Sequence, residues 1–274
     1  TWKKIIIIIF LIIIIILLIL KHYLNAKRNI SLGVIKYRNK QPIGSKKTNV
    51  IYQLISDVDD TLHPAGWILG HGIAGVDSEG SRDIYYPCVK ELHRQIYERF
   101  KLPTVLVSAN PFPKSESSKK KIADELGIEF IEYNGGEMIS SIWSTVLNIL
   151  PIINTETAYY NIHYTSMANV KIQKITNHIN DMKERYEDTN IEYRAIWIGD
   201  NGQGDLLAAK KLLNNGEIFA ALIHNVDPIK HSGISSSWAS GEEQHLFSFD
   251  NYRTVISQLK SLGLTFLKDC DEDV

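Results

Sequence analysis

Short apolar runs alternate with helix-like patterns along the chain from about residue 49 onward. The runs are too continuously apolar for strands with one exposed face, so they predict buried strands at 50–56, 104–108, 128–133, 195–199 and 218–223. Apolar residues at helical spacing predict helices between them, at 88–100, 117–127, 170–186 and 205–216. This alternation predicts a three-layer α/β domain with a mainly parallel sheet. Ligands of such sheets bind beyond the carboxyl ends of the strands.

A different apolar segment, almost entirely Ile and Leu, runs unbroken from Ile5 to Leu20 between flanking lysines. Its 16 residues would span roughly 24 Å as a helix, somewhat less than a hydrocarbon core of about 30 Å. The alternative is a cleaved signal peptide, but the residues after Leu20 lack a clean small-x-small cleavage site. We therefore expect an uncleaved transmembrane anchor over residues 1–22.

A basic segment, residues 23–48, follows the predicted anchor. Residues 21–50 hold eight lysines and arginines and no acid. By the positive-inside tendency this charge places the globular part in the cytosol, although Lys3 and Lys4 oppose that orientation. The segment is either a flexible linker or a stretch attracted to anionic lipid. The triplet Asn29-Ile30-Ser31 would accept a glycan only on the luminal side.

Overall composition narrows the classes of function. With 274 residues and a formal net charge of −1, the chain suits one globular domain, predicted at 49–268, and it lacks the basic excess of a nucleic-acid binder. Cys88 and Cys270 form no CxxC pair, so we expect neither a zinc site nor a disulfide, but two reduced thiols in a reducing compartment. Residues 269–274 are interpreted as a solvated acidic tail.

Two carboxylates, Asp57 and Asp59, emerge directly from the first predicted strand. At that spacing a loop can aim both at one small volume, where they repel each other unless a cation lies between them. Oxygen ligands of this kind suit Mg²⁺. An acidic turn or a helix cap is the alternative. A calcium-binding EF-hand is excluded, because Leu62 and Ile68 stand where that loop needs Gly and Glu.

A second acidic site follows the predicted strand at 195–199. Asp200 and Asp205 lie in the sequence GDNGQGD, and Asp205 falls at the start of the next predicted helix. This stretch alone would be read as a turn and a helix cap. A third apolar strand ends in Ser108, whose hydroxyl can hydrogen-bond a phosphate oxygen. Polar groups at three strand ends predict one shared site.

These sites, in this order, resemble the motifs of the haloacid dehalogenase superfamily over residues 50–262. The DxDxT motif of the superfamily is matched by Asp57, Asp59 and Thr61, its strand-ending serine by Ser108, and its acidic pair by Asp200 and Asp205. Its lysine corresponds to Lys171 or Lys174, and we prefer Lys171 because Ile175 and Ile179 follow it four and eight residues on.

SDVDDT, VSANPF and GDNGQGD are most similar to the lipin-related phosphatidate phosphatase domain of the actin-patch protein type. The chain departs from that pattern at Asn201, which replaces the usual Ser, and in the Gly-rich stretch 62–86.

The resemblance implies a phosphoric monoester hydrolase that works through an aspartyl-phosphate on Asp57, with Asp59 as general acid and base. It implies Mg²⁺ held by Asp57, the carbonyl of Asp59, Asp200 and Asp205, while Asp60 is expected to be structural. Phosphate-binding residues would be Thr61, Ser108, Asn110 and Lys171.

The expected substrate is phosphatidate at a membrane, which would be hydrolysed to diacylglycerol. Two alternatives remain, a tethered phosphatase of soluble phosphoesters and a non-catalytic phospholipid-binding module. We expect a minimal cap, with a small flap at 62–86 and a loop-rich lid at 134–170.

Overall fold

The computed structural model describes residues 49–64, 77, 84–108, 115–134, 156–201, 204–226 and 245–271. The chain divides into two units, residues 1–46 and 47–274, and all described residues belong to the second. The predicted anchor and basic segment therefore lie outside the described residues, as do Asn110 and most of the predicted flap. Within the described ranges, no helix combines the length and apolar character needed to cross a bilayer.

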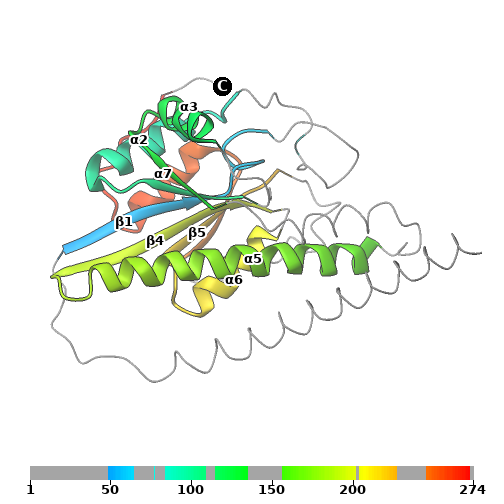
Figure 1. Ribbon diagram of the computed structural model, residues 1–274. Helices are drawn as coiled ribbons and strands as arrows, with labels where there is room; N and C mark the ends of the chain where they lie inside the picture. The colour runs from blue at the N-terminus through cyan, green and yellow to red at the C-terminus, as the bar shows by residue number, and fades with distance from the viewer. Residues whose placement is uncertain are drawn as a thin grey trace, which may run out of the picture. The chain divides into compact units, whose positions relative to one another are not determined.

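A six-stranded sheet forms the centre of the described domain (Figure 1). Its order is β3-β2-β1-β4-β5-β6, and every neighbouring pair is parallel. In chain order the strands are β1 (Asn49–Ser56), β2 (Thr104–Val107), β3 (Ile131–Asn134), β4 (Ile191–Asp200), β5 (Ala220–His224) and β6 (Leu246–Phe249). The predicted mainly parallel α/β class is confirmed.

Helices cover both faces of the sheet, which accounts for the continuous apolar character of its strands. One face carries α2 (Val89–Phe100), α3 (Glu116–Leu126) and α7 (Tyr252–Ser261), and the other carries α5 (Glu156–Arg185) and α6 (Asp205–Asn214) (Figure 1). Two separate apolar clusters result. One packs α2, α3 and α7 against the sheet, and the other packs α5 and α6 against the opposite face.

Helix α5 is longer than its apolar pattern predicts. It begins at Glu156 rather than near residue 170, so residues 156–170 of the predicted loop-rich lid are helical instead. The helical spacing of apolar residues is visible in the sequence only where the helix packs on the sheet, through Ile175, Ile179 and Met182. In Figure 1 the amino-terminal turns of α5 project beyond the carboxyl ends of the strands, where no sheet surface imposes such a period.

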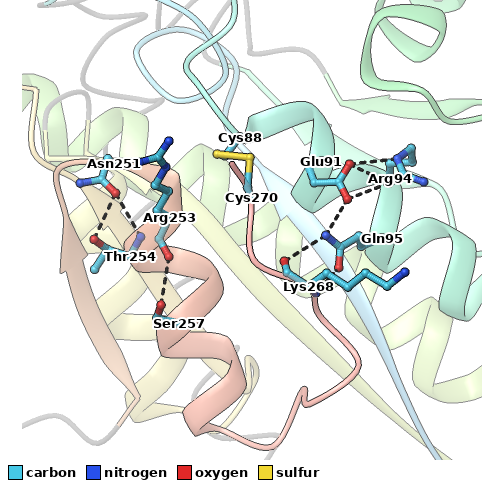
Figure 2. The surroundings of a disulfide bond; sticks show 10 residues. All are labelled: Cys88, Glu91, Arg94, Gln95, Asn251, Arg253, Thr254, Ser257, Lys268 and Cys270. Carbon is cyan, nitrogen blue, oxygen red and sulfur yellow. Dashed lines mark hydrogen bonds and ion pairs between the residues drawn. A yellow bond between two sulfur atoms is a disulfide. The ribbon is translucent and has the colours of Figure 1, made fainter. Parts of the chain in front are cut away.

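Cys88 and Cys270 form a disulfide, so the prediction of two reduced thiols was wrong (Figure 2). Their sequence separation of 182 hid their proximity. After α7 the chain returns along α2, where the side chain of Gln95 donates to the carbonyl of Lys268 at 3.1 Å and accepts from its N–H at 2.6 Å. Cys270 is buried there, so it is part of the packed domain rather than of a solvated tail.

Candidate active site

The site lies where the order of the sheet reverses. The chain passes from β1 outward to β2 and β3, and from β4 outward to β5 and β6, so β1 and β4 are neighbours whose connections diverge. Such a point opens a crevice at the carboxyl ends of the two strands. Ser56 pairs with Ile198, and the N–H of Asp57 donates to the carbonyl of Ile198 at 2.9 Å. Asp57 and Asp200 therefore leave the sheet side by side.

Three carboxylates converge in this crevice. One oxygen from each of Asp57, Asp200 and Asp205 lies within 4.8 Å of the other two, and all three residues are buried. The predicted convergence of two strand-end loops is thus what the structure contains. Because these loops are 143 residues apart by number (200 minus 57), only the parallel pairing of β1 with β4 brings them together.

Lys171 supplies a buried cation to the same cluster. Its ammonium lies 3.0 Å from Oδ1 of Asp57 and also donates to Oδ1 of Asp205. Ile175 and Ile179 pack on the sheet one and two turns further along α5, which places Lys171 on the same face, level with the strand ends. Of the two candidate lysines, Lys171 is the one that contacts Asp57 and Asp205, and Lys174, one turn further along α5, is half-buried.

The backbone around Gly199 is shaped to hold the carboxylate of Asp205. Asp205 begins α6, and its Oδ2 accepts from the N–H of Asp200 at 3.3 Å. A Cβ added at Gly199 would lie 2.6 Å from that same oxygen, closer than any stable contact. Gly204, at φ 83°, makes the left-handed turn into the helix, which favours glycine. Gly199 therefore allows close packing, and Gly204 allows a tight turn.

The cluster carries more negative than positive charge. Burial raises the pKa of Asp57, and Lys171 opposes this shift while Asp205 and Asp59 add to it. Burial and repulsion by Asp205 and Asp57 raise the pKa of Asp200. Burial alone would lower the pKa of Lys171, but the attraction of Asp205 and Asp57 outweighs it, so the net shift is upward. The lysine therefore stays charged and offsets one of the three carboxylates.

A divalent cation fits this excess of buried oxygen ligands. Oδ2 of Asp57 is buried and accepts no hydrogen bond from any residue in the described ranges. A buried carboxylate oxygen without a partner is costly, and coordination of a hard cation would satisfy it. An oxygen-only donor set with few protein ligands is the kind that Mg²⁺ uses.

The remaining predicted residues surround the cluster. Asp59 is half-buried, and its side chain is not one of the three converging carboxylates. Thr61 is buried, and within the described part of the chain its Oγ1 makes no hydrogen bond. Ser108 is buried directly after β2, where its N–H donates to the carbonyl of Asn134 at 3.1 Å. The structure thus places these three around the crevice, and Asn110 lies outside the described residues.

Several residues at the site were not predicted from the sequence. Nδ1 of His224 donates to the carbonyl of Asp60 at 2.9 Å, and the hydroxyl of Tyr252 donates to the carbonyl of Thr61 at 2.7 Å. Tyr133, at the end of β3, lies near enough to Asp59 and Asp57 that their charges add to burial in raising its pKa. These contacts join segments that are distant in the chain, so the sequence carries no local signal for them.

Comparison with known proteins adds no assignment. No family model matches the chain, and neither the curated proteins nor the solved structures contain a match. The chemistry of the site therefore has to be argued from its own geometry.

Proposed function

We propose that this protein is a Mg²⁺-dependent phosphatase of the haloacid dehalogenase type that hydrolyses phosphatidate to diacylglycerol and phosphate. The observation that carries the proposal is the convergence of Asp57, Asp200, Asp205 and Lys171 at two adjacent strand ends. Three carboxylates and one lysine, all buried, match the groups needed to bind a cation, attack phosphorus and offset the charge of a phosphoryl group.

Asp57 is the proposed nucleophile. Lys171 orients this carboxylate through its 3.0 Å contact with Oδ1, so that one carboxylate oxygen would face the bound cation and the other would attack the phosphorus. A bond forms between this oxygen and phosphorus while the bond from phosphorus to the ester oxygen breaks, giving an aspartyl-phosphate. Bound Mg²⁺ would neutralise the carboxylates and polarise the phosphoryl oxygens.

Asp59 is the proposed general acid and base. Its half-buried side chain lies two residues from Asp57 and has access to solvent. It donates a proton to the departing alkoxide and then accepts one from the water that hydrolyses the acyl phosphate, so protons balance over the cycle. Its main-chain carbonyl is a proposed Mg²⁺ ligand, beside the carboxylates of Asp57, Asp200 and Asp205.

Phosphate binding falls to the residues around the crevice. Lys171 and Ser108 would bind the transferring oxygens, and Thr61 has a buried hydroxyl available within the acidic loop, which we define as residues 57–61. Asn110 is retained as a proposed phosphate contact from the sequence motif. Preorganised donors of this kind stabilise charge that develops in the transition state.

Phosphatidate is proposed as the substrate because the sequence places an apolar, Ile-rich segment and a basic segment before the domain. Both would hold the crevice near an anionic bilayer, and the basic side chains would contribute about 1 kcal/mol each near its surface. A tethered phosphatase of soluble phosphoesters has the same site chemistry. A phospholipid-binding module without turnover would not need both Asp57 and Asp59.

The decisive experiment compares the oxidised wild-type protein with Asp57→Asn and with Asp181→Asn, an exposed control on α5. Phosphate release is measured from phosphatidate vesicles and from a panel of soluble phosphoesters, with Mg²⁺ or with EDTA. We expect Mg²⁺-dependent release on vesicles that Asp57→Asn abolishes and Asp181→Asn preserves. Release only from soluble esters would overturn the lipid substrate. Unchanged turnover in Asp57→Asn, or no release from any ester, would overturn the phosphatase.

A further inference from the structure

Asp77 is hydrogen-bonded to the acidic loop. Its main-chain N–H donates to Oδ1 of Asp60 at 3.2 Å, across 17 residues of sequence. Its own carboxylate is held from the other side, because the hydroxyl of Tyr86 donates to Oδ2 of Asp77 at 2.7 Å. Asp60 itself is fully buried. The three residues therefore form a continuous hydrogen-bonded connection from the start of α2 to the acidic loop.

Asp60 is held in a demanding backbone conformation at the end of this connection. Its φ is 60°, in the left-handed region that Asp and Asn tolerate better than other non-glycine residues. Its N–H donates to the carbonyl of His63 at 2.8 Å, and its own carbonyl accepts from His224 at 2.9 Å. With its carboxylate bound to Asp77, Asp60 is fixed at its N–H, its carbonyl and its side chain.

The residue before Asp60 is Asp59, so the two share one peptide plane. Fixing φ at Asp60 fixes the direction in which the carbonyl of Asp59 points and limits where the Asp59 side chain can lie. A displacement of about 1 Å in a reacting group can cost on the order of a hundredfold in rate. The hydrogen bonds of Asp60 therefore control the group that the proposed reaction uses for proton transfer.

We propose that Asp77 is a positioning residue, which holds Asp60 and through it orients Asp59 for proton transfer and for cation binding. The inference rests on the proposed phosphatase function for its kinetic consequence, but the contacts from Tyr86 through Asp77 to Asp60 exist independently of it. The main-chain N–H of Asp77 is the donor that reaches the acidic loop.

Tyr85 and Tyr86 provide a matched pair of variants. The hydroxyl of Tyr85 donates to Oε2 of Glu125 on α3 at 2.9 Å, a bond of the same kind that does not lead to the acidic loop. Tyr86→Phe removes the bond to Asp77 and Tyr85→Phe removes the bond to Glu125, each by loss of one hydroxyl. Asp77→Ala and Asp77→Asn form a second pair, since the Asn side chain keeps an oxygen that can accept from Tyr86.

The measurements are kcat and KM for phosphate release at saturating Mg²⁺, Mg²⁺ affinity by calorimetry, and Tm. We expect Tyr86→Phe and Asp77→Ala to lower kcat about tenfold or more and to weaken Mg²⁺ binding, with KM little changed. Tyr85→Phe and Asp77→Asn should stay within about twofold of wild type. A purely structural role would lower Tm equally for both tyrosine variants and leave kcat of the folded protein unchanged.

Each outcome is decisive. If Tyr86→Phe and Tyr85→Phe behave alike in kcat and in Mg²⁺ affinity, Asp77 is not a positioning residue. If the wild type releases no phosphate from any ester, the phosphatase proposal fails, but calorimetry still tests Asp77. Weaker Mg²⁺ binding in Asp77→Ala and Tyr86→Phe alone would then support the inference. Equal binding in all variants, or no binding by the wild type, would overturn it.

Discussion

Lys171 lies 3.0 Å from Asp57, and both side chains are almost completely buried. Their contact joins a helix on one face of the sheet to the end of the central strand β1. A buried charge is tolerated only with a partner, so each of these residues depends on the other for its stability as well as for any chemistry. This mutual dependence has measurable consequences.

Replacement of Lys171 by Met should destabilise the domain and abolish turnover. Asp57 and Asp205 would lose the cation that contacts both, and removal of one partner from a buried pair costs about 3–5 kcal/mol. Lys174 is half-buried in the next turn of α5. The free energy of unfolding of Lys174→Met should therefore lie within about 1 kcal/mol of the wild-type value, and the variant should keep its activity. Urea denaturation and phosphate release measure both. An inactive Lys174→Met with a fully active Lys171→Met would reverse the assignment of the lysine.

Asp200→Asn should change stability in opposite directions with and without Mg²⁺. In EDTA the variant loses a buried charge that Asp205 and Asp57 repel, so its Tm should rise. When Mg²⁺ is present at a hundred times its dissociation constant, binding should raise the free energy of unfolding of the wild type by about 2.7 kcal/mol. The free energy of unfolding of the variant should change little. Thermal unfolding of the wild type and of the variant, each in EDTA and in Mg²⁺, gives the four Tm values to compare. A wild-type Tm that is identical in EDTA and in Mg²⁺ would contradict a cation site among these carboxylates.

Gly199→Ala should disturb the site without creating a cavity in the core. The new methyl group would lie 2.6 Å from Oδ2 of Asp205, so the carboxylate must move away from the N–H of Asp200. We expect phosphate release to fall at least tenfold and Mg²⁺ binding to weaken, with a stability loss of about 1–3 kcal/mol from overpacking. Gly216→Ala is a useful comparison, because its added Cβ meets no described atom within 4 Å, and its positive φ of 66° is the source of strain. Equal Mg²⁺ affinity in the two variants would argue against this role of Gly199.

His93 should make the domain sensitive to acid. Burial lowers its pKa from 6.5 to about 3. Between these values the unfolded chain binds a proton that the folded chain does not, so stability falls as the pH is lowered, by up to about 1.4 kcal/mol per pH unit. The contribution is fully present above pH 6.5.

His93→Gln can keep a hydrogen bond to Thr104, which lies 3.0 Å from Nδ1, while it removes the titration. Urea denaturation at pH values from 7 to 4.5 should therefore give a shallower loss of stability for the variant. Parallel pH profiles for the two proteins would show that His93 does not contribute.

The sequence was most informative where acidic residues directly follow predicted strands. Continuous apolar runs predicted five of the six strands, because a strand covered on both faces must be apolar throughout. The four acidic residues were identifiable because two of them followed each of two such runs. Lys171 was identifiable because its helix shows the period of the face that packs on the sheet.

The remainder depended on contacts between distant residues. Strand β6 (Leu246–Phe249) is short and mostly half-buried, so its pattern gave no continuous run. The contacts of Asp77, His224 and Tyr252 with the acidic loop join segments that only the assembled sheet brings together. Local periodicity records which side of an element is covered, but not which distant residue covers it.

The bond between Cys88 and Cys270 has a practical consequence for how this protein must be made. It joins the first residue before α2 to a segment beyond α7, so the loop that it closes contains strands β2 to β6. Disulfides form and persist in oxidising compartments and are rare in the cytosol, so the redox state of this pair in cells would test the cytosolic orientation expected from the lysine distribution. Bacterial expression in a thiol-reducing strain would yield the domain with both cysteines reduced, whereas export to the periplasm would yield the disulfide-bonded domain.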